Sequence, residues 1–272
     1  MSRRRSAPAP VSVQTSQGVA ELVADPANPG GRILYIGGLA SSHVDLDDPA
    51  TLRMDYLHRL ARALDVLLPR GAPADVVHLG GGAFALPRAL AATRPRISQE
   101  VYEIEPGLVE LARAELRLRR TAALRVRVGD AAERLAARPD DSADAIVCDA
   151  FVGTDIPPAL TTDAFMQHVR RVLRPGGAYL VNVVDAPPWA ATDRVKAALR
   201  PAFDRAFAFG AREVVRRRRA GNVLIVAGST LRLQAFARGL AGGPYPAHVR
   251  PLIEASSPDA TLHAVRATTP LR

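Results

Sequence analysis

The pattern of hydrophobic and polar positions divides the chain into a short β-rich beginning and a long alternation of strands and helices. Alternating apolar residues near the N-terminus predict a small β element after a frayed tail, and residues 32–36 (RILYI) predict a stronger strand. The acidic segment 41–48 (SSHVDLDD) is typical of a loop. From Leu52 to Leu68 apolar residues recur at helical spacing, which predicts a helix before Pro69.

Beyond residue 71 the pattern becomes a regular succession of apolar strands and amphipathic helices. Each connection is long enough for a right-handed βαβ crossover, so the strands are expected to be parallel with helices on both faces. The predicted strands begin at Val76, Gln99, Leu124, Asp144 and Ala178, and the predicted helices cover residues 84–93, 106–118, 131–137 and 162–173.

The end of the chain departs from this alternation. A predicted helix at residues 189–202 is followed by two apolar segments, 206–217 and 222–227, joined by a Gly-Asn turn that indicates an antiparallel hairpin. The fold class predicted is therefore α/β: a Rossmann-like, doubly wound, mostly parallel seven-stranded sheet with an antiparallel C-terminal hairpin, plus a small N-terminal β element.

Four parts of the chain are expected. They are a disordered tail at residues 1–18, the N-terminal β element with its linking helix at residues 19–70, the main α/β domain at residues 71–240, and a C-terminal extension at residues 241–272.

Composition narrows the class of protein. The chain has 272 residues and one cysteine, Cys148, so it has no internal disulfide, and no Cys/His cluster has the spacing of a metal site. The N-terminal arginines lack the apolar stretch of a signal peptide, and no apolar run approaches the ~18 residues that span a bilayer. These features predict a cytoplasmic protein with no metal and no membrane contact.

The formal charge of +9 suggests a nucleic-acid partner, but the source of the charge argues against it. Lys196 is the only lysine, so the basic residues are almost all arginine, a bias that reflects genome composition. The best candidate surface, the arginine run 216–219, is more typical of the solvated end of a strand. Nucleic acid is therefore not an expected partner.

Candidate binding residues stand where the predicted strands end. Gly80, Gly81 and Gly82 open a G-x-G-x-x-A string that leads from a strand into a helix, and Glu103 follows about 20 residues later. Glycines let a ligand approach the backbone, and the carboxylate can accept both ribose hydroxyls of a nucleoside. Together they predict an adenosine-containing cofactor, whereas each alone also fits a tight turn or a helix cap.

Two aspartates follow the next strands. Asp130, in a Gly-Asp-Ala sequence, is placed to bond an adenine amino group or to cap a helix. Asp149 follows an apolar strand and is expected to project into the ligand crevice, where a carboxylate without a task is costly. Asp149 is therefore the first candidate for a functional residue.

The order of these motifs resembles the class I S-adenosylmethionine-dependent fold, and LRPGG at residues 173–177 is the most specific motif in that order. Within that superfamily the chain resembles the spermidine synthase family of aminopropyltransferases over roughly residues 20–230. The resemblance is carried by GRILYIGG before a helical Asp55-Tyr56, and by LGGG, YEIEP and IVCDAF.

The resemblance implies aminopropyl transfer from decarboxylated S-adenosylmethionine to a diamine such as putrescine, releasing 5′-methylthioadenosine. The enzyme must hold an unprotonated amine in line with the carbon beside sulfur. By similarity Asp149 is the base that binds this amine, and Tyr56, on the helix that faces the site, is the second catalytic candidate. By the same similarity the nucleoside is held by Gly80, Gly81, Gly82, Glu103, Ile104, Asp130 and Ala131.

The chain also departs from the family pattern. Ala83 stands where the family has an aspartate that holds the aminopropyl amine, and Val152 stands in place of a second aspartate. Asp155 and Asp185, or Asp45 and Asp47 of the acidic segment, are the carboxylates that we expect to replace them in substrate binding. Trp189 either walls the substrate pocket or anchors the next helix.

Two other functions remain open, and a third, an NAD-dependent dehydrogenase, is disfavoured. Ala83 favours a small-molecule methyltransferase that uses intact S-adenosylmethionine, since the carboxylate of that donor would meet no repelling charge. A nucleoside-binding member without transfer activity is the second alternative. An NAD-dependent dehydrogenase explains neither Asp149 nor the LRPGG turn. The expected partner is a small amine, a homodimer is compatible with the sequence, and we predict that His78 and Cys148 are core residues.

Overall fold

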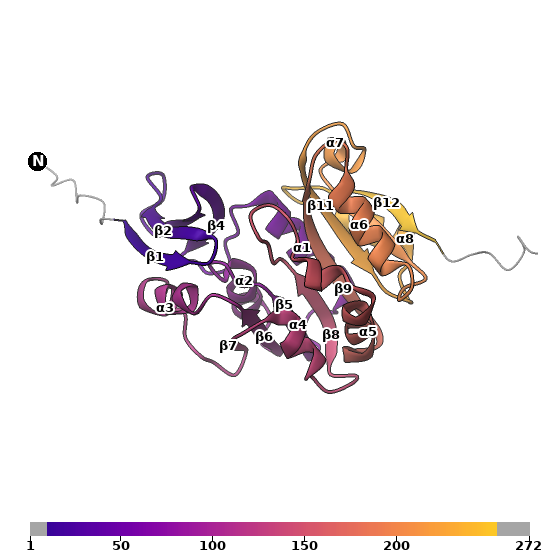
Figure 1. Ribbon diagram of the computed structural model, residues 1–272, viewed down its shortest axis with the longest axis horizontal. Coiled ribbons are helices and arrows are strands. Elements are labelled where there is room, and N and C mark those ends of the chain that lie inside the picture. The colour runs from indigo at the N-terminus through magenta and orange to yellow at the C-terminus, as the bar shows by residue number, and fades with distance from the viewer. Residues whose placement is uncertain (1–9, 255–272) are drawn as a thin grey trace, which may run out of the picture.

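Two β-sheets organise residues 10–254, the part of the chain that the computed structural model describes (Figure 1). The larger sheet has the order β12-β10-β11-β9-β8-β5-β6-β7, with β5 to β9 parallel and β9 to β12 antiparallel. Its strands are β5 (Ala74–Leu79), β6 (Ile97–Glu103), β7 (Leu124–Val128), β8 (Ala143–Cys148), β9 (Leu173–Asp185), β10 (Ala206–Gly210), β11 (Gly221–Ala227) and β12 (His248–Ile253).

Helices cover both faces of this sheet because its strands are apolar on both sides. Val76 belongs to one hydrophobic cluster and its neighbour Val77 to the other, as the alternation of a strand requires. The first cluster packs beneath α1 (Asp55–Leu67), α2 (Ala85–Thr93), α3 (Pro106–Glu115) and α8 (Leu233–Leu240). The second packs beneath α4 (Ala131–Ala136), α5 (Asp163–Val172), α6 (Ala190–Leu199) and α7 (Arg212–Val215), with a 3-10 turn at Pro158–Thr161. The predicted α/β fold class is confirmed.

The smaller sheet is antiparallel and lies beside α3, at the indigo end of the ribbon in Figure 1. The approach is close, because a Cβ on Gly107 of α3 would meet Val13 at 2.7 Å. Its strands are β1 (Val11–Thr15), β2 (Gly18–Ala24), β3 (Gly31–Ile36) and β4 (Leu39–Asp45).

Two expectations for this region are corrected. The predicted tail ends too late, since Val11–Thr15 forms β1, and residues 1–9 of that tail lie outside the described residues. The segment predicted as an acidic loop is largely β4, whose polar residues His43 and Asp45 are buried. The reason is a long-range pairing, because His43 bonds Asp25 at 3.0 Å.

The C-terminal hairpin also differs from the prediction. Its first strand ends at Gly210 and is followed by α7, because Val214 and Val215 turn inward and are buried. The region expected as an extension supplies an eighth strand, β12, at the sheet edge next to β10. The edge position tolerates Pro251, which has no N–H to donate.

The LRPGG segment forms the start of β9, directly after α5, at the end of the sheet opposite the carboxyl termini of the parallel strands. Arg174 forms ion pairs with Asp75 at 2.8 Å and with Asp144 at 2.7 Å, near the starts of β5 and β8. The motif is therefore a brace of the sheet.

His78 and Cys148 lie in the core, as predicted. Burial lowers the pKa of His78 to about 4, and its Nε2 bonds Oε1 of Gln99 at 2.9 Å. Burial raises the pKa of the Cys148 thiol to about 11, so it stays protonated at neutral pH.

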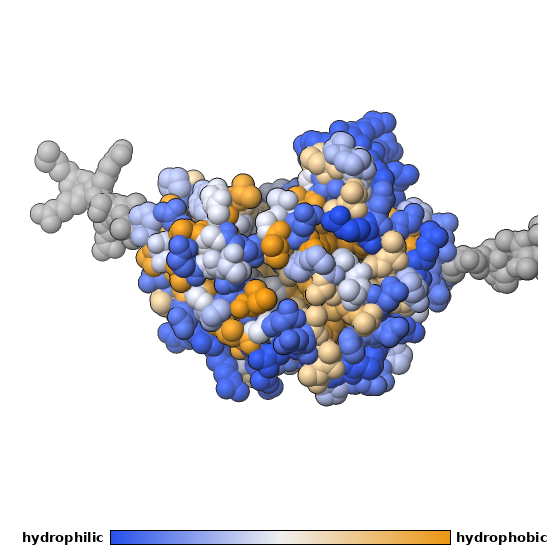
Figure 2. All heavy atoms as spheres, viewed as in Figure 1, coloured by the Kyte–Doolittle hydropathy of each residue, from blue (hydrophilic) through white to orange (hydrophobic). Residues whose placement is uncertain are grey.

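The surface and the helices show two further features. In Figure 2 polar residues cover most of the visible face, and apolar residues gather in patches near its middle. Within residues 10–254, no helix is long and apolar enough to cross a membrane, and no three His, Cys, Asp or Glu residues are grouped as a metal site.

Candidate active site

The glycine loop, Glu103 and Asp149 meet at the carboxyl edge of the parallel strands. Gly80 follows β5 and its N–H donates to Tyr102 O of β6 at 2.9 Å, while Asp149 N donates to Leu79 O at 2.9 Å. A Cβ on Gly80 would lie 2.5 Å from the carbonyl oxygen of Asp149, and the φ of Gly80 is +92°. Glycine at this position is therefore what lets the β5 and β8 ends touch.

Glu103 holds the glycine loop through hydrogen bonds to its backbone. Its Oε2 accepts from Gly81 N at 2.7 Å and from Gly82 N at 3.2 Å, and its Oε1 accepts from Glu105 N at 3.0 Å. Burial raises the pKa of Glu103, and these three backbone N–H groups oppose the rise by favouring the ionised form. The buried carboxylate of Glu103 thus lies beside the backbone of the glycine loop, at the strand end that the sequence predicts.

Asp149 lies between two side-chain donors. Tyr56 of α1 donates to its Oδ2 at 3.1 Å, and Asn182 of β9 donates to its Oδ1 at 2.8 Å. Burial raises the pKa of Asp149, and the two hydrogen bonds lower it. Burial and the charge of Asp149 hold the pKa of Tyr56 well above its usual value, so the phenol remains a donor. The two catalytic candidates, Tyr56 and Asp149, thus lie within hydrogen-bond distance of each other.

Asn182 is a site residue that the sequence analysis missed. It is buried in β9, and its Oδ1 accepts from the side chain of Asn222 at 3.0 Å. The signal was available, because an amide inside the apolar run AYLVNVV must find hydrogen-bond partners when it is buried. Nothing in the run itself indicates that the partner is Asp149.

The predicted adenine-side residues follow β6 and β7. Asp130 caps α4, with its Oδ1 accepting from Ala132 N at 2.7 Å and from Glu133 N at 3.0 Å, and Ala131 begins that helix. Ile104 is 55% exposed, an unusual state for a large apolar residue beside a buried glutamate. Val128 at the end of β7 is exposed as well. Two exposed apolar side chains at neighbouring strand ends suit a flat aromatic ligand.

Ala83 is fully enclosed. It is 1% exposed and belongs to the hydrophobic cluster that includes Phe84, whose φ is +59°. An alanine in this environment offers a ligand no charge.

The predicted substrate residues have different surroundings. Asp155 is exposed in the loop after β8 and forms an ion pair with Arg194 at 3.0 Å. Asp185 is buried, and its carboxylate accepts from Ala186 N at 2.9 Å and from Thr192 N at 2.7 Å, which fixes the start of α6. Trp189 is buried in the core beneath α6, in agreement with its reading as a helix anchor.

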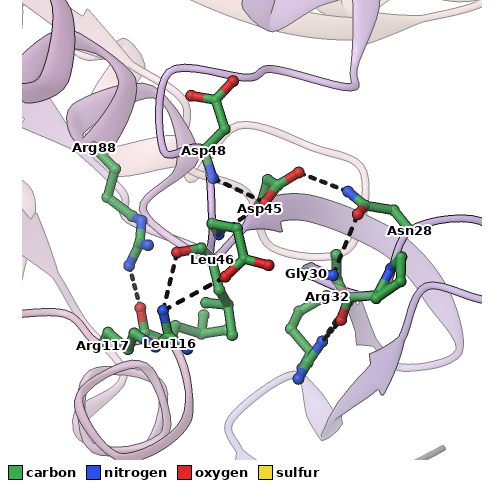
Figure 3. Close-up of polar contacts among 12 residues, drawn as sticks. Asn28, Gly30, Arg32, Asp45, Leu46, Asp48, Arg88, Leu116 and Arg117 are labelled. Atoms are coloured by element: carbon green, nitrogen blue, oxygen red, sulfur yellow. Dashed lines mark hydrogen bonds and ion pairs between the residues drawn. The ribbon is translucent and has the colours of Figure 1, made fainter.

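Asp45 and Asp47 lie in the N-terminal sheet and the turn that follows it. Figure 3 shows Asp45 between Asn28 and the backbone of Asp48, and its Oδ2 accepts from Asn28 at 2.6 Å. Hydrogen bonds from Asn28 and from the Asp48 and Asp47 backbone lower the pKa of Asp45. Asp47 is exposed, 3.7 Å from Arg117. Asp45 is thus a brace of the turn.

The turn of the β1–β2 hairpin reaches the same edge of the large sheet, which the sequence did not predict. Gln17 donates to Phe151 O at 2.8 Å and accepts from Gly153 N at 3.0 Å. The backbone N–H of Ser16 donates to Glu105 at 2.9 Å. The side chain of Gln17 therefore holds the loop that follows Asp149.

The sequence of the chain is similar to a family model and to two known relatives. Residues 76–177 match a family model described as a methyltransferase domain. The chain is 32% identical over 161 residues to the polyamine aminopropyltransferase of Chromobacterium violaceum, a match that covers 56% of this chain and 57% of that protein. It is 28% identical over 140 residues to the polyamine aminopropyltransferase of Vibrio vulnificus, with 51% and 46% covered. The matches span about half the length of these relatives.

A solved structure resembles almost the whole chain. The crystal structure of a probable spermidine synthase from Corynebacterium glutamicum superposes with a TM-score of 0.80 at 26% identity. The match covers 97% of this chain and 96% of that one, so it includes the N-terminal sheet as well as the methyltransferase domain.

Proposed function

We propose that the chain, which is similar to polyamine aminopropyltransferases and to a probable spermidine synthase, is an aminopropyltransferase of the spermidine synthase family. The donor is decarboxylated S-adenosylmethionine and the acceptor is a small amine. The observation that carries the proposal is the carboxylate of Asp149, held by Tyr56 and Asn182 at the strand edge that also carries Glu103.

Asp149 acts on the acceptor amine. The amine reaches the site as an ammonium, and the carboxylate binds it and takes one proton, which leaves a nitrogen lone pair. That nitrogen attacks the aminopropyl carbon next to sulfur, so a C–N bond forms while the C–S bond breaks and its electrons return to sulfur. The products are the aminopropylated amine and neutral 5′-methylthioadenosine. The rise in the pKa of Asp149 brings the carboxylate closer to the basicity that a proton acceptor needs.

The nucleoside half of the donor is held at the ends of β5 to β7. Glu103 accepts the ribose hydroxyls with the lone pairs that its backbone donors leave free, beside the glycine backbone. Ile104 and Val128 enclose the adenine ring, and Asp130 and Ala131 lie at its amino edge. The transfer step needs no metal to activate the leaving group, because the positively charged sulfonium already leaves readily as a neutral thioether.

The far end of the acceptor meets the loop after β8. Asp155 is exposed there, and its ion pair with Arg194 is one that a substrate ammonium can replace. Asp185 and Trp189 contribute by fixing the start of α6. A diamine is the acceptor that best uses two carboxylates.

The test is a mass-spectrometric assay with the full chain, in which decarboxylated and intact S-adenosylmethionine are offered separately against a panel of amines. We expect 5′-methylthioadenosine and an aminopropylated product from the decarboxylated donor alone. Asp149→Asn should abolish product formation, while the exposed control Asp140→Asn should not. Absence of transfer with every amine, despite nucleoside binding, would leave only the binding function.

One observation favours a second function, methyl transfer from intact S-adenosylmethionine. Ala83 is buried among apolar side chains and offers the donor's amine no carboxylate. S-adenosylhomocysteine formed from the intact donor in the same assay would select this alternative.

A further inference from the structure

Five arginine side chains surround a pocket of about 170 Å³ at the free edge of the larger sheet. The pocket lies between the end of α3, the connection that follows it, and β7, the last strand of the sheet. Its lining residues are Arg113, Leu118, Arg119, Arg120, Arg125, Val126 and Arg127. None of them is a residue of the candidate active site.

Arginine is more frequent around this pocket than in the chain as a whole. Residues 117–127 carry five arginines and no Asp or Glu, in a chain whose formal net charge is +9. In the part of the chain that the structure describes, the five pocket arginines form a single ion pair, between Arg127 and Glu100. Three other arginines, Arg94, Arg174 and Arg217, each pair with an aspartate, which the remaining four arginines of the pocket do not within residues 10–254. The pocket therefore presents guanidinium groups that carboxylates do not neutralise.

The connection that bears the arginines is anchored at both ends. Leu116 and Leu118 are buried, and the carbonyl of Leu116 accepts from Arg88, as Figure 3 shows. At the other end Thr121 N donates to Leu124 O at 3.1 Å. Arg119 and Arg120 lie between these anchors, so binding an anion requires ordering two side chains and not the backbone.

The wall of the pocket strengthens attraction to an anion. Leu118 and Val126 supply an apolar surface against which charge interactions are less screened than in open water. The backbone of β7 supplies a further donor for an anion. Ala123 O and Gly129 N form hydrogen bonds with β6, so the alternation along β7 directs the N–H of Val126 to the free edge of the sheet.

We propose that this pocket binds an oligophosphate, either as an inorganic chain or as the phosphate group of a nucleotide. Guanidinium groups pair with phosphate oxygens through two parallel hydrogen bonds, so several arginines around one small volume select a compact anion of multiple charge. A single carboxylate would leave most of the donors unused. An extended nucleic acid would need a basic stripe along one face, whereas these five arginines line one small volume.

The experiment is calorimetric titration of the full chain with sodium tripolyphosphate, and separately with ATP, at about 0.15 M salt, where exposed charges are screened beyond about 8 Å. We expect saturable binding of one equivalent. Equal affinity for both probes assigns the phosphates as the ligand, and tighter binding of ATP assigns a nucleotide; both results support the site.

Matched variants localise the binding. Arg119→Gln with Arg120→Gln should weaken tripolyphosphate binding by at least about tenfold, because charge-assisted hydrogen bonds are lost. Arg125→Gln, on the strand, should weaken it as well. Arg218→Gln with Arg219→Gln removes the same charge from another exposed segment and should change the affinity by less than about twofold. Transferase activity should be unchanged in all of these variants.

Three outcomes would overturn the proposal. They are no binding at this salt concentration, equal weakening by both double variants, and tighter binding of a single-stranded oligonucleotide that is lost in both double variants. The second would show diffuse attraction to net charge, and the third would show a nucleic-acid surface instead of a pocket.

Discussion

Asn182 donates its side-chain N–H to Oδ1 of Asp149 at 2.8 Å, and its own amide oxygen is held by Asn222 at 3.0 Å. The second bond fixes which way the first amide points, so an N–H and not a carbonyl faces the carboxylate. Asp149 directly follows β8, Asn182 lies in β9 and Asn222 in β11, and these three strands are neighbours in the sheet. Asn222, on the antiparallel strand β11, thus helps to set the hydrogen bonding of Asp149 at the end of the parallel strand β8.

The first prediction concerns the pH dependence of transfer. Removing the donor with Asn182→Leu destabilises the ionised form of Asp149 and raises its pKa, so the acid limb of kcat/KM should move to higher pH by about one unit. Asn222→Leu keeps the donor but frees its orientation, and should move the limb less. An acid limb that stays in place in both variants, with melting temperatures intact, would separate Asp149 from the proton transfer.

The second prediction concerns nucleoside affinity. Glu103→Gln replaces a carboxylate that accepts from Gly81, Gly82 and Glu105 with an amide that has one acceptor oxygen. Calorimetry with 5′-methylthioadenosine should show about 10- to 100-fold weaker binding, the range for a hydrogen bond to a charged group. The matched control is Glu110→Gln on the exposed side of α3, which should bind normally. Unchanged affinity in the Glu103 variant would contradict its place at the ribose.

These two sites show what the sequence can and cannot predict. The sequence predicts Glu103 and Asp149 because the carboxyl ends of parallel strands lie together at one edge of an open sheet, independently of how the helices pack. Asn182 was missed because its partner lies on another strand, and register between strands is set by the whole sheet. Likewise the polar residues of β4 predict a loop, because the sequence does not show that hydrogen bonds from His43 to Asp25 and from Asn28 to Asp45 offset the cost of burying them.

The third prediction separates steric clash from backbone strain at glycine. Gly38, in the β3–β4 turn, has a φ of +80° and open space around its Cα, so Gly38→Ala should cost about 1 kcal/mol in unfolding free energy. Gly80 has a φ of +92°, and a methyl group there meets the Asp149 carbonyl at 2.5 Å. Gly80→Ala should therefore cost at least about 3 kcal/mol in denaturant unfolding. Equal costs would mean that the β5 and β8 ends separate easily.

The fourth prediction concerns stability in acid. The pKa of His78 is lowered to about 4 by burial, whereas the unfolded chain has an ordinary histidine near 6.5. Above pH 6.5 both states are neutral there, and as pH falls toward 4 the unfolded state binds the proton first, so stability declines. The loss attributable to His78 is about 3 kcal/mol at most. His78→Gln should flatten this decline in unfolding free energy, and His168→Gln, at a less buried histidine, should not.

The fifth prediction tests the contact between the N-terminal hairpin and the loop after Asp149. Gln17 binds that loop through both ends of its amide, to Phe151 O and Gly153 N. Gln17→Ala removes both hydrogen bonds, so hydrogen exchange in residues 151–155 should accelerate while exchange in β8 stays slow. Gln14→Ala, at an exposed position of β1, is the control and should leave the loop protected. Because the loop also carries Asp155, KM for the amine should rise more than kcat falls. Loop exchange that is unaffected by Gln17→Ala would mean that β8 alone sets the position of the loop.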